Sequence, residues 1–173
     1  MIKKLFLGAV SGGLIVFMWS AVSWMALPWH KLTMEKFMNE AAVSEFMVQN
    51  APKQGVYLLP WAMEKAQGGP LLLAAISPEG PRSMGQTMVF SLLVQILGAF
   101  FVTFLVLEGK IPKYRDRAGC AAAFAFAAGV VCYLPNWIWW GVPLVYTVVN
   151  MLDLLIGWFL AGLAIAKIAQ PTS

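Results

Sequence analysis

The chain of 173 residues has little charge and little cysteine. Only 12% of its residues are charged, about half the share found in soluble domains, which argues against a water-soluble globule. Two cysteines are too few for a disulfide-stapled secreted domain. Intrinsic disorder needs low hydrophobicity, whereas 60% of this chain is hydrophobic and 13% is aromatic. The class that remains is a membrane protein.

The sequence also lacks the residue patterns of common enzymes. It has no Gly-x-Ser-x-Gly, no Walker loop, no His-Glu-x-x-His and no Cys-x-x-Cys. A single histidine removes most acid–base and haem schemes that need two. We therefore predict no enzymatic activity and no cofactor. A membrane enzyme that acts on a lipid through Asp153 or Glu108 is the catalytic alternative.

Four apolar segments are long enough to cross a bilayer, which takes roughly 20 helical residues. We predict the spans at 5–27, 86–107, 118–134 and 142–166. Lys3 and Lys4 precede the first span, as in a signal peptide, but its apolar run is longer than the roughly 7–15 residues of a signal-peptide core. We therefore expect an uncleaved anchor. The expected fold class is an all-α membrane protein, a single-domain bundle of four transmembrane helices.

Basic residues predict the orientation, because Lys and Arg flank the cytoplasmic side of membrane spans. They lie before the first span, in the loop 108–117 and after the fourth span: Lys3, Lys4, Lys110, Lys113, Arg115, Arg117 and Lys167. Segment 28–85 has balanced charge. We expect both termini in the cytoplasm, segment 28–85 outside it, and a bacterial inner membrane. The basic loop is either a topological signal alone or also a surface for anionic lipid headgroups.

Tryptophans mark the outer interface independently, since an indole ring favours the headgroup level. They lie near the end of the first span and in the connection after the third: Trp24, Trp29, Trp137, Trp139 and Trp140. We interpret them as an anchoring belt. The alternative is a cage that stacks on a ligand.

Segment 28–85 predicts a small extracytoplasmic cap on the outer ends of the helices. After Pro28, charged and apolar residues alternate at helical spacing, which predicts an amphipathic helix to about Asn50 along the bilayer surface. Repeated Gly and Pro then exclude another long helix. The short apolar runs 56–59 and 71–76 can pair as a hairpin if something packs against them.

Small residues predict how the helices pack, because lipid supplies no hydrophobic force between them. They form spaced pairs in the first and fourth spans: Gly8-x-x-x-Gly12 with Gly13, and Gly157-x-x-x-Ala161 with Gly162. The third span is dominated by Ala and Gly and offers little bulk to lipid. We expect the third span to be central in the bundle or buried against another protein.

Asp153 is the charged residue expected inside a span, near the bilayer midplane. An acidic side chain there has a high energetic cost, which makes Asp153 a candidate functional residue. Tyr146 and Asn150 share its helical stripe, and Gln95 at similar depth in the second span is its expected partner. Three roles stay open for this polar cluster. It either fixes helix packing, lines a proton or cation pathway, or contacts a partner.

A candidate metal site combines the histidine with methionines one and two helical turns later: His30, Met34 and Met38. Imidazole with thioethers suits Cu(I). Packing is the alternative, because methionine commonly fills irregular apolar surfaces. Cys120 and Cys132 are separated by about 18 Å of helical rise, so we expect inert buried thiols rather than a disulfide.

These patterns favour a non-enzymatic multi-pass membrane protein that acts through protein contacts. It would be an accessory, assembly or regulatory component of a membrane complex, or a homo-oligomer. The alternative is a small carrier or channel for protons, cations or a small solute that uses the Asp153 cluster. A Cu(I)-binding protein and a lipid-modifying enzyme rank below both. The expected partners are membrane lipids and another protein or a second copy, but no nucleic acid, since the basic residues form no patch.

Overall fold

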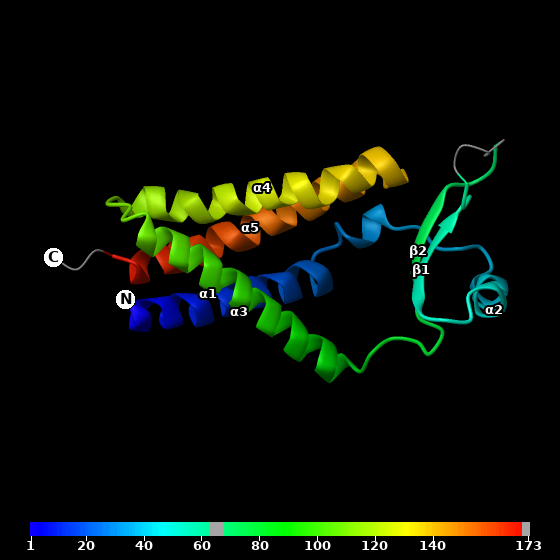
Figure 1. Cartoon of the computed structure of the whole chain (residues 1–173), viewed down its shortest axis with the longest axis horizontal. Coiled ribbons are helices and arrows are strands. Elements are labelled where there is room, and N and C mark those ends of the chain that lie inside the picture. Colours follow the sequence, from blue (N-terminus) through cyan, green and yellow to red (C-terminus); the bar gives the residue numbers. More distant parts are fainter. Residues whose placement is uncertain (63–67, 171–173) are drawn as a thin grey trace.

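The computed structural model describes residues 1–62 and 68–170. The described chain is mostly helical, and within it four helices are long and apolar enough to cross a membrane: α1 (Ile2–Met25), α3 (Met84–Glu108), α4 (Tyr114–Trp140) and α5 (Leu144–Ile168). The prediction of four candidate spans is confirmed by their length and composition. Figure 1 shows these helices side by side, with both described chain ends at one end, which we call the terminal end.

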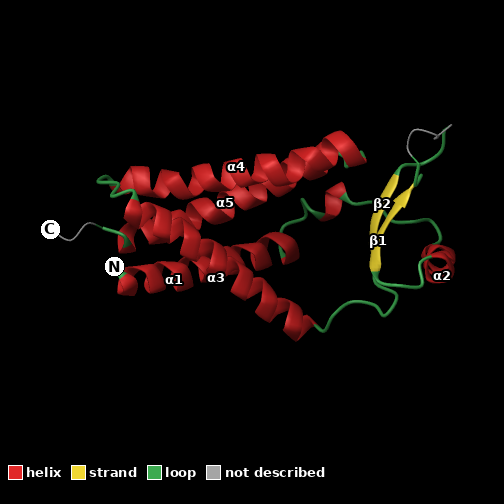
Figure 2. Cartoon of the chain, in the orientation of Figure 1, coloured by secondary structure: helices red, strands yellow, loops and turns green. Residues whose placement is uncertain are grey.

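The opposite end carries the segment between α1 and α3, and we call it the hairpin end. There a 3-10 turn, η1 (Lys31–Thr33), precedes the short helix α2 (Glu40–Asn50). Strand β1 (Gly55–Leu59) pairs antiparallel with β2 (Leu72–Ile76), and Tyr57 lies opposite Ala74 (Figure 2). The predicted hairpin between the two short apolar runs is confirmed.

The amphipathic helix predicted from residue 29 to about Asn50 is wrong in its first half. Residues 34–39 form no helix, and α2 begins only at Glu40. Asn39 caps α2, because its side chain accepts a hydrogen bond from the Ala42 amide at 3.0 Å. The apolar residues before it, including Phe37 and Met38, are exposed within the chain. Since α2 itself buries no residue, the cap at Asn39, and not packing, marks where the helix begins.

The connection after α4 is shorter than predicted. The third span was predicted to end at residue 134, but α4 continues through Pro135 to Trp140. Gly141 ends the helix with φ 67°, and its N–H donates to the Asn136 carbonyl. A left-handed residue at this point favours glycine. The connection to α5 is therefore only residues 141–143, and Trp137, Trp139 and Trp140 lie on a helix.

Glycines set the closest approaches between the helices, as their spacing predicted. A Cβ added to Gly13 of α1 would lie 2.6 Å from the Ile96 Cα of α3. A Cβ added to Gly162 of α5 would lie 2.7 Å from the Ala121 Cβ of α4. Small residues at these positions let the helix backbones approach closely. The resulting van der Waals packing is a main source of attraction between helices in lipid.

α4 is not the central helix that the sequence led us to expect. The neighbours follow the order α4, α5, α1, α3, and α4 packs chiefly on α5. Its buried residues form one stripe: Arg117, Ala118, Ala121, Ala125 and Gly129. Phe126 and Val131 lie on the exposed remainder. The position of α1 and α5 in the middle brings two distant parts of the chain together. The alternative, that another protein covers α4, stays a prediction.

Candidate functional site

Asp153, near the middle of α5, contacts the last turns of α1. The Trp19 indole Nε1 donates to Asp153 Oδ1 at 2.7 Å and lies 3.1 Å from the Asp153 backbone oxygen. The other carboxylate oxygen, Oδ2, lies 3.3 Å from Nε2 of His30. The Asp153 side chain is 13% exposed. Both carboxylate oxygens are therefore engaged within the chain.

Gly157 makes room for the indole that reaches Asp153. It lies one helical turn after Asp153 on α5, and a Cβ added there would lie 2.8 Å from Trp19 Cδ1. Trp19 and Ser23 are also one turn apart, so α1 presents both side chains on the same face. The predicted small-residue position on α5 thus serves an aromatic side chain rather than a second helix backbone.

His30 folds back against the end of α1 and is buried there, 1% exposed. Its ring stacks on Trp24, with centroids 3.9 Å apart and planes 7° apart, and meets Trp29 edge to face. His30 Nε2 also lies 3.1 Å from Ser23 Oγ, which accepts a hydrogen bond from Trp29 Nε1 at 2.9 Å. Aromatic rings thus enclose the polar atoms.

We call these six residues the Asp153–His30 cluster: Trp19, Ser23, Trp24, Trp29, His30 and Asp153. The cluster joins α1, the segment after it and α5. In surroundings of low dielectric such hydrogen bonds are strong, and leaving one unmade is costly. The cluster is therefore well suited to hold the hairpin end of the molecule in one arrangement.

The cluster contains serine, histidine and aspartate but not the geometry of a nucleophilic relay. In such a relay the two ring nitrogens serve the hydroxyl and the carboxylate separately. Here Ser23 and Asp153 both lie against Nε2 of His30. His30 Nδ1 is buried and has no hydrogen-bond partner in the described part of the chain. Ser23 is fully buried, so a substrate has no access to its hydroxyl.

The other members of the predicted polar cluster form no hydrogen bond with Asp153 in the described part of the chain. Asn150 Nδ2 donates to the Tyr146 backbone oxygen at 2.8 Å, a contact within α5. Gln95 lines two pockets along α3 together with Thr87 and Ser91. Among the described residues, Trp19 is the hydrogen-bonding partner of Asp153, His30 lies within ion-pair distance of it, and Gln95 forms no contact of either kind with it.

The residues of the candidate copper site do not converge. Met34 and Met38 lie in a non-helical segment and are exposed, whereas His30 is buried and its Nε2 faces Asp153 and Ser23. The helical spacing on which the Cu(I) hypothesis rested is therefore wrong. Across the residues described, His, Cys, Asp and Glu form no group of three that could hold a metal ion. Cys120 is half-buried, but Cys132 is exposed on α4, contrary to expectation.

Sequence reasoning missed Trp19 and Ser23 and gave Trp24 and Trp29 only an interfacial role. The spacing of Trp19 and Ser23 by one turn was a usable signal for a shared face. The sequence gives no comparable signal that His30 returns to that face, because this depends on how the segment after Pro28 turns. Comparison with protein families, curated proteins and solved structures finds no match to this chain. A function for this chain is therefore inferred from its geometry.

Proposed function

We propose that this is a non-enzymatic multi-pass membrane protein that acts through protein contacts. It binds a transmembrane helix of another protein or of a second copy, as an accessory, assembly or regulatory component of a membrane complex or homo-oligomer. The observation that carries this proposal is in the hairpin-side half of α3, which diverges from α1 (Figure 1). A polar stripe on this half lines a pocket whose other wall is the end of α1.

α3 packs through only one of its halves. Its buried residues are all in the terminal half: Ala99, Val102, Thr103 and Val106. In the hairpin-side half, Phe90, Leu93 and Val94 are exposed. This half is as apolar as a membrane span requires, so lipid alone can solvate most of it.

The polar stripe on this half of α3 is harder to explain by contact with lipid. Thr87, Ser91 and Gln95 follow one another at four-residue intervals and line pockets of about 430 and 290 Å³. The Gln95 amide makes no hydrogen bond to any other residue described here, while Thr87 donates to the Ser83 carbonyl. Polar side chains inside membranes commonly pair across helices, with about 1 kcal/mol gained per contact. A partner helix with a polar side chain would fill the pocket and satisfy Gln95.

The Asp153–His30 cluster favours this function over the carrier or channel alternative. A carboxylate that passes protons or cations needs contact with water along a path. Both Asp153 oxygens instead face donors or rings of the same chain, at 2.7 Å from Trp19 and 3.3 Å from His30. Such an arrangement supports a role in holding helices together.

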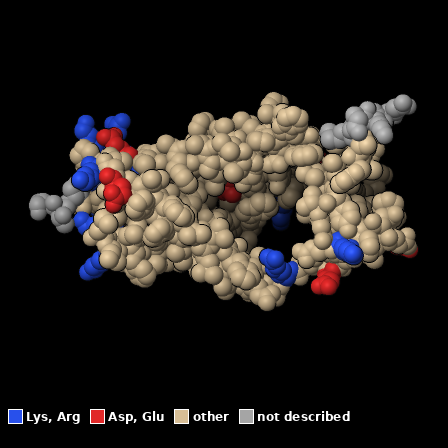
Figure 3. Space-filling view, viewed as in Figure 1, with Lys and Arg blue, Asp and Glu red and all other residues tan. Residues whose placement is uncertain are grey.

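We also propose that the protein lies in a bacterial inner membrane with both termini in the cytoplasm. Lys and Arg gather at the terminal end, and the middle of the helices shows almost no charge (Figure 3). The positive-inside tendency then puts the terminal end in the cytoplasm. Segment 28–85, with α2 and the hairpin, would form the small extracytoplasmic cap.

Site-directed photo-crosslinking in native membranes tests the contact function. A photoreactive amino acid in place of Gln95 is expected to give a crosslinked protein adduct. The same amino acid in place of Leu93 is the matched control, because two residues along a helix turn it by about 200° to the opposite face. The adduct mass distinguishes a second copy from a different protein. Crosslinks to lipid only, at both positions, would contradict the proposal.

A further inference from the structure

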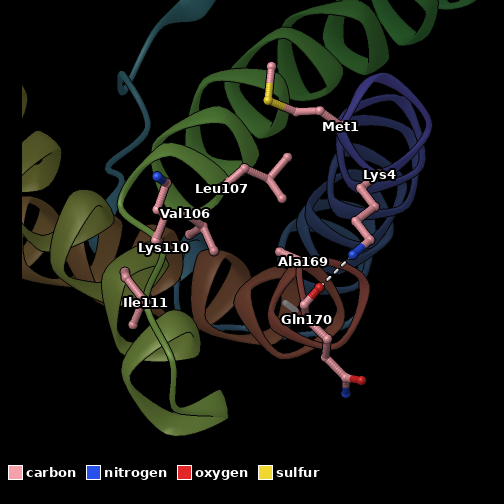
Figure 4. A pocket seen from close by; sticks show the side chains of 8 residues that line it. All are labelled: Met1, Lys4, Val106, Leu107, Lys110, Ile111, Ala169 and Gln170. Atoms are coloured by element: carbon pink, nitrogen blue, oxygen red, sulfur yellow. Dashed lines mark hydrogen bonds between the residues drawn. The ribbon is translucent and has the colours of Figure 1, made fainter. Parts of the chain in front are cut away.

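A cavity of about 470 Å³ lies at the terminal end, between the start of α1 and the ends of α3 and α5. Lys4 and Lys110 line it, together with Gln170 and apolar side chains that include Val106, Leu107 and Ile111. Figure 4 shows Lys4 and Lys110 on opposite sides of this cavity, with Leu107 between them. The cavity is distant from the Asp153–His30 cluster and from the polar stripe on α3, which both lie toward the hairpin end.

The cavity is positively charged, and among the described residues no carboxylate opposes this charge. Lys4 Nζ donates to the Gln170 backbone oxygen at 2.6 Å, which uses one of the three N–H donors of the ammonium group (Figure 4). Lys110 follows the end of α3 and is exposed. Neither lysine forms an ion pair with another residue that the structure describes. An anion would therefore meet two ammonium groups with donors to spare.

The remaining wall of the cavity is apolar. Val106 and Ala169 are buried beneath it, and Met1, Leu107 and Ile111 complete the lining. Cationic and apolar groups occur together where helix ends meet the headgroup layer, and basic pockets between transmembrane helices suit anionic headgroups. A soluble phosphate ion would gain from the lysines but nothing from the apolar wall.

We propose that this cavity binds the headgroup phosphate of an anionic phospholipid. Lys4 and Lys110 hold the phosphate from two sides, and the glycerol and the first acyl carbons contact Val106, Leu107 and Ile111. The bound lipid thereby connects α1, α3 and α5 where the polypeptide leaves a gap. This site differs from a general attraction of the basic loop for the membrane surface, because it depends on two particular lysines.

Native mass spectrometry of the purified full-length protein tests the site. The protein is released from nanodiscs of phosphatidylcholine that contain a minor share of phosphatidylglycerol. The wild type is expected to retain phosphatidylglycerol selectively over phosphatidylcholine. In the double variant Lys4→Gln with Lys110→Gln, this selectivity is expected to fall roughly tenfold. The matched control is Lys3→Gln with Lys113→Gln, which removes two charges from the same helix start and loop but spares the cavity lining. The control is expected to retain the lipid.

Three outcomes would overturn the proposal. One is that the wild type retains no phosphatidylglycerol, and another is that both double variants lose it equally, which would indicate surface attraction alone. The third is that inorganic phosphate in detergent raises the melting temperature as much as phosphatidylglycerol does, which would assign the cavity to a soluble anion. The single variant Lys110→Gln, at an exposed position, keeps the experiment valid if the double variant fails to fold.

Discussion

Asp153 can lie within an apolar helix because side chains from other parts of the chain face both of its carboxylate oxygens. Trp19 contributes an indole N–H, and His30 approaches from the segment beyond Pro28. Removing one partner of such a buried pair leaves the other buried with nothing to offset the loss of its contact with water. At this scale the cluster is a set of paired contacts whose energy can be measured pair by pair.

A double-mutant cycle measures the contact between Trp19 and Asp153. Trp19→Phe and Asp153→Ala are each expected to lower the free energy of unfolding in detergent. Their combination is expected to be non-additive by about 0.5–2 kcal/mol, because either change alone breaks the same hydrogen bond. Asp116→Ala, at an exposed position on α4, is the control and should add independently to Trp19→Phe. Additivity in the Trp19–Asp153 cycle itself would mean that the contact contributes nothing.

At the scale of helices, glycine positions decide which pairs approach. The Cβ added at Gly13 would meet the backbone of Ile96, which cannot rotate away as a side chain can. The same addition at Gly119 of α4 meets nothing within 4 Å. Gly13 therefore lies at a contact between two helices, whereas Gly119 lies next to open space.

Alanine substitutions at these two glycines should have different effects on stability. Gly13→Ala is expected to lower the free energy of unfolding by about 1–3 kcal/mol, since the helices must separate to admit the methyl group. Gly119→Ala is expected to leave it unchanged or raise it by up to about 1 kcal/mol, because alanine favours the helix. Thermal or denaturant unfolding in detergent gives both values. Equal effects would contradict the described packing of α1 on α3.

The segment between α1 and α3 shows that helix boundaries depend on capping residues as well as on periodicity. Its apolar residues at helical spacing predicted one helix, yet only α2 forms, where Asn39 supplies a cap. The hairpin was predictable, because two short apolar runs lie on either side of turn residues. Short apolar runs between turn residues therefore predicted the strands, whereas helical periodicity predicted the helix correctly only in its second half.

At the scale of the whole molecule, charge sets apart the two ends. Arg117 belongs to the basic terminal end, yet it is buried and donates from Nε to the Ala166 carbonyl at 2.9 Å. Its Nη1 donates to the Ile111 and Pro112 carbonyls, each at 2.8 Å. One charge that the sequence assigned to topology thus also fixes the loop against the end of α5.

Cysteine labelling in intact cells tests the proposed orientation. In a variant with Cys120 and Cys132 replaced by alanine, Glu79→Cys is expected to react with a membrane-impermeant maleimide. Asp116→Cys is expected to react only after the cells are permeabilised. Both positions are exposed, and both substitutions leave the positive charges that direct insertion intact. The reverse labelling pattern would place the termini outside.

The sequence by itself determined the four long apolar helices, the hairpin and the glycine faces, because these follow from neighbouring residues and from helical or strand periodicity. It also identified Asp153 as the charged residue inside a span. Only the tertiary structure decided that Trp19 and His30 meet Asp153, that Gln95 lies elsewhere, and that α4 is at the edge. These contacts depend on how each helix is rotated and on where a connecting segment returns. Local periodicity carries no information about either.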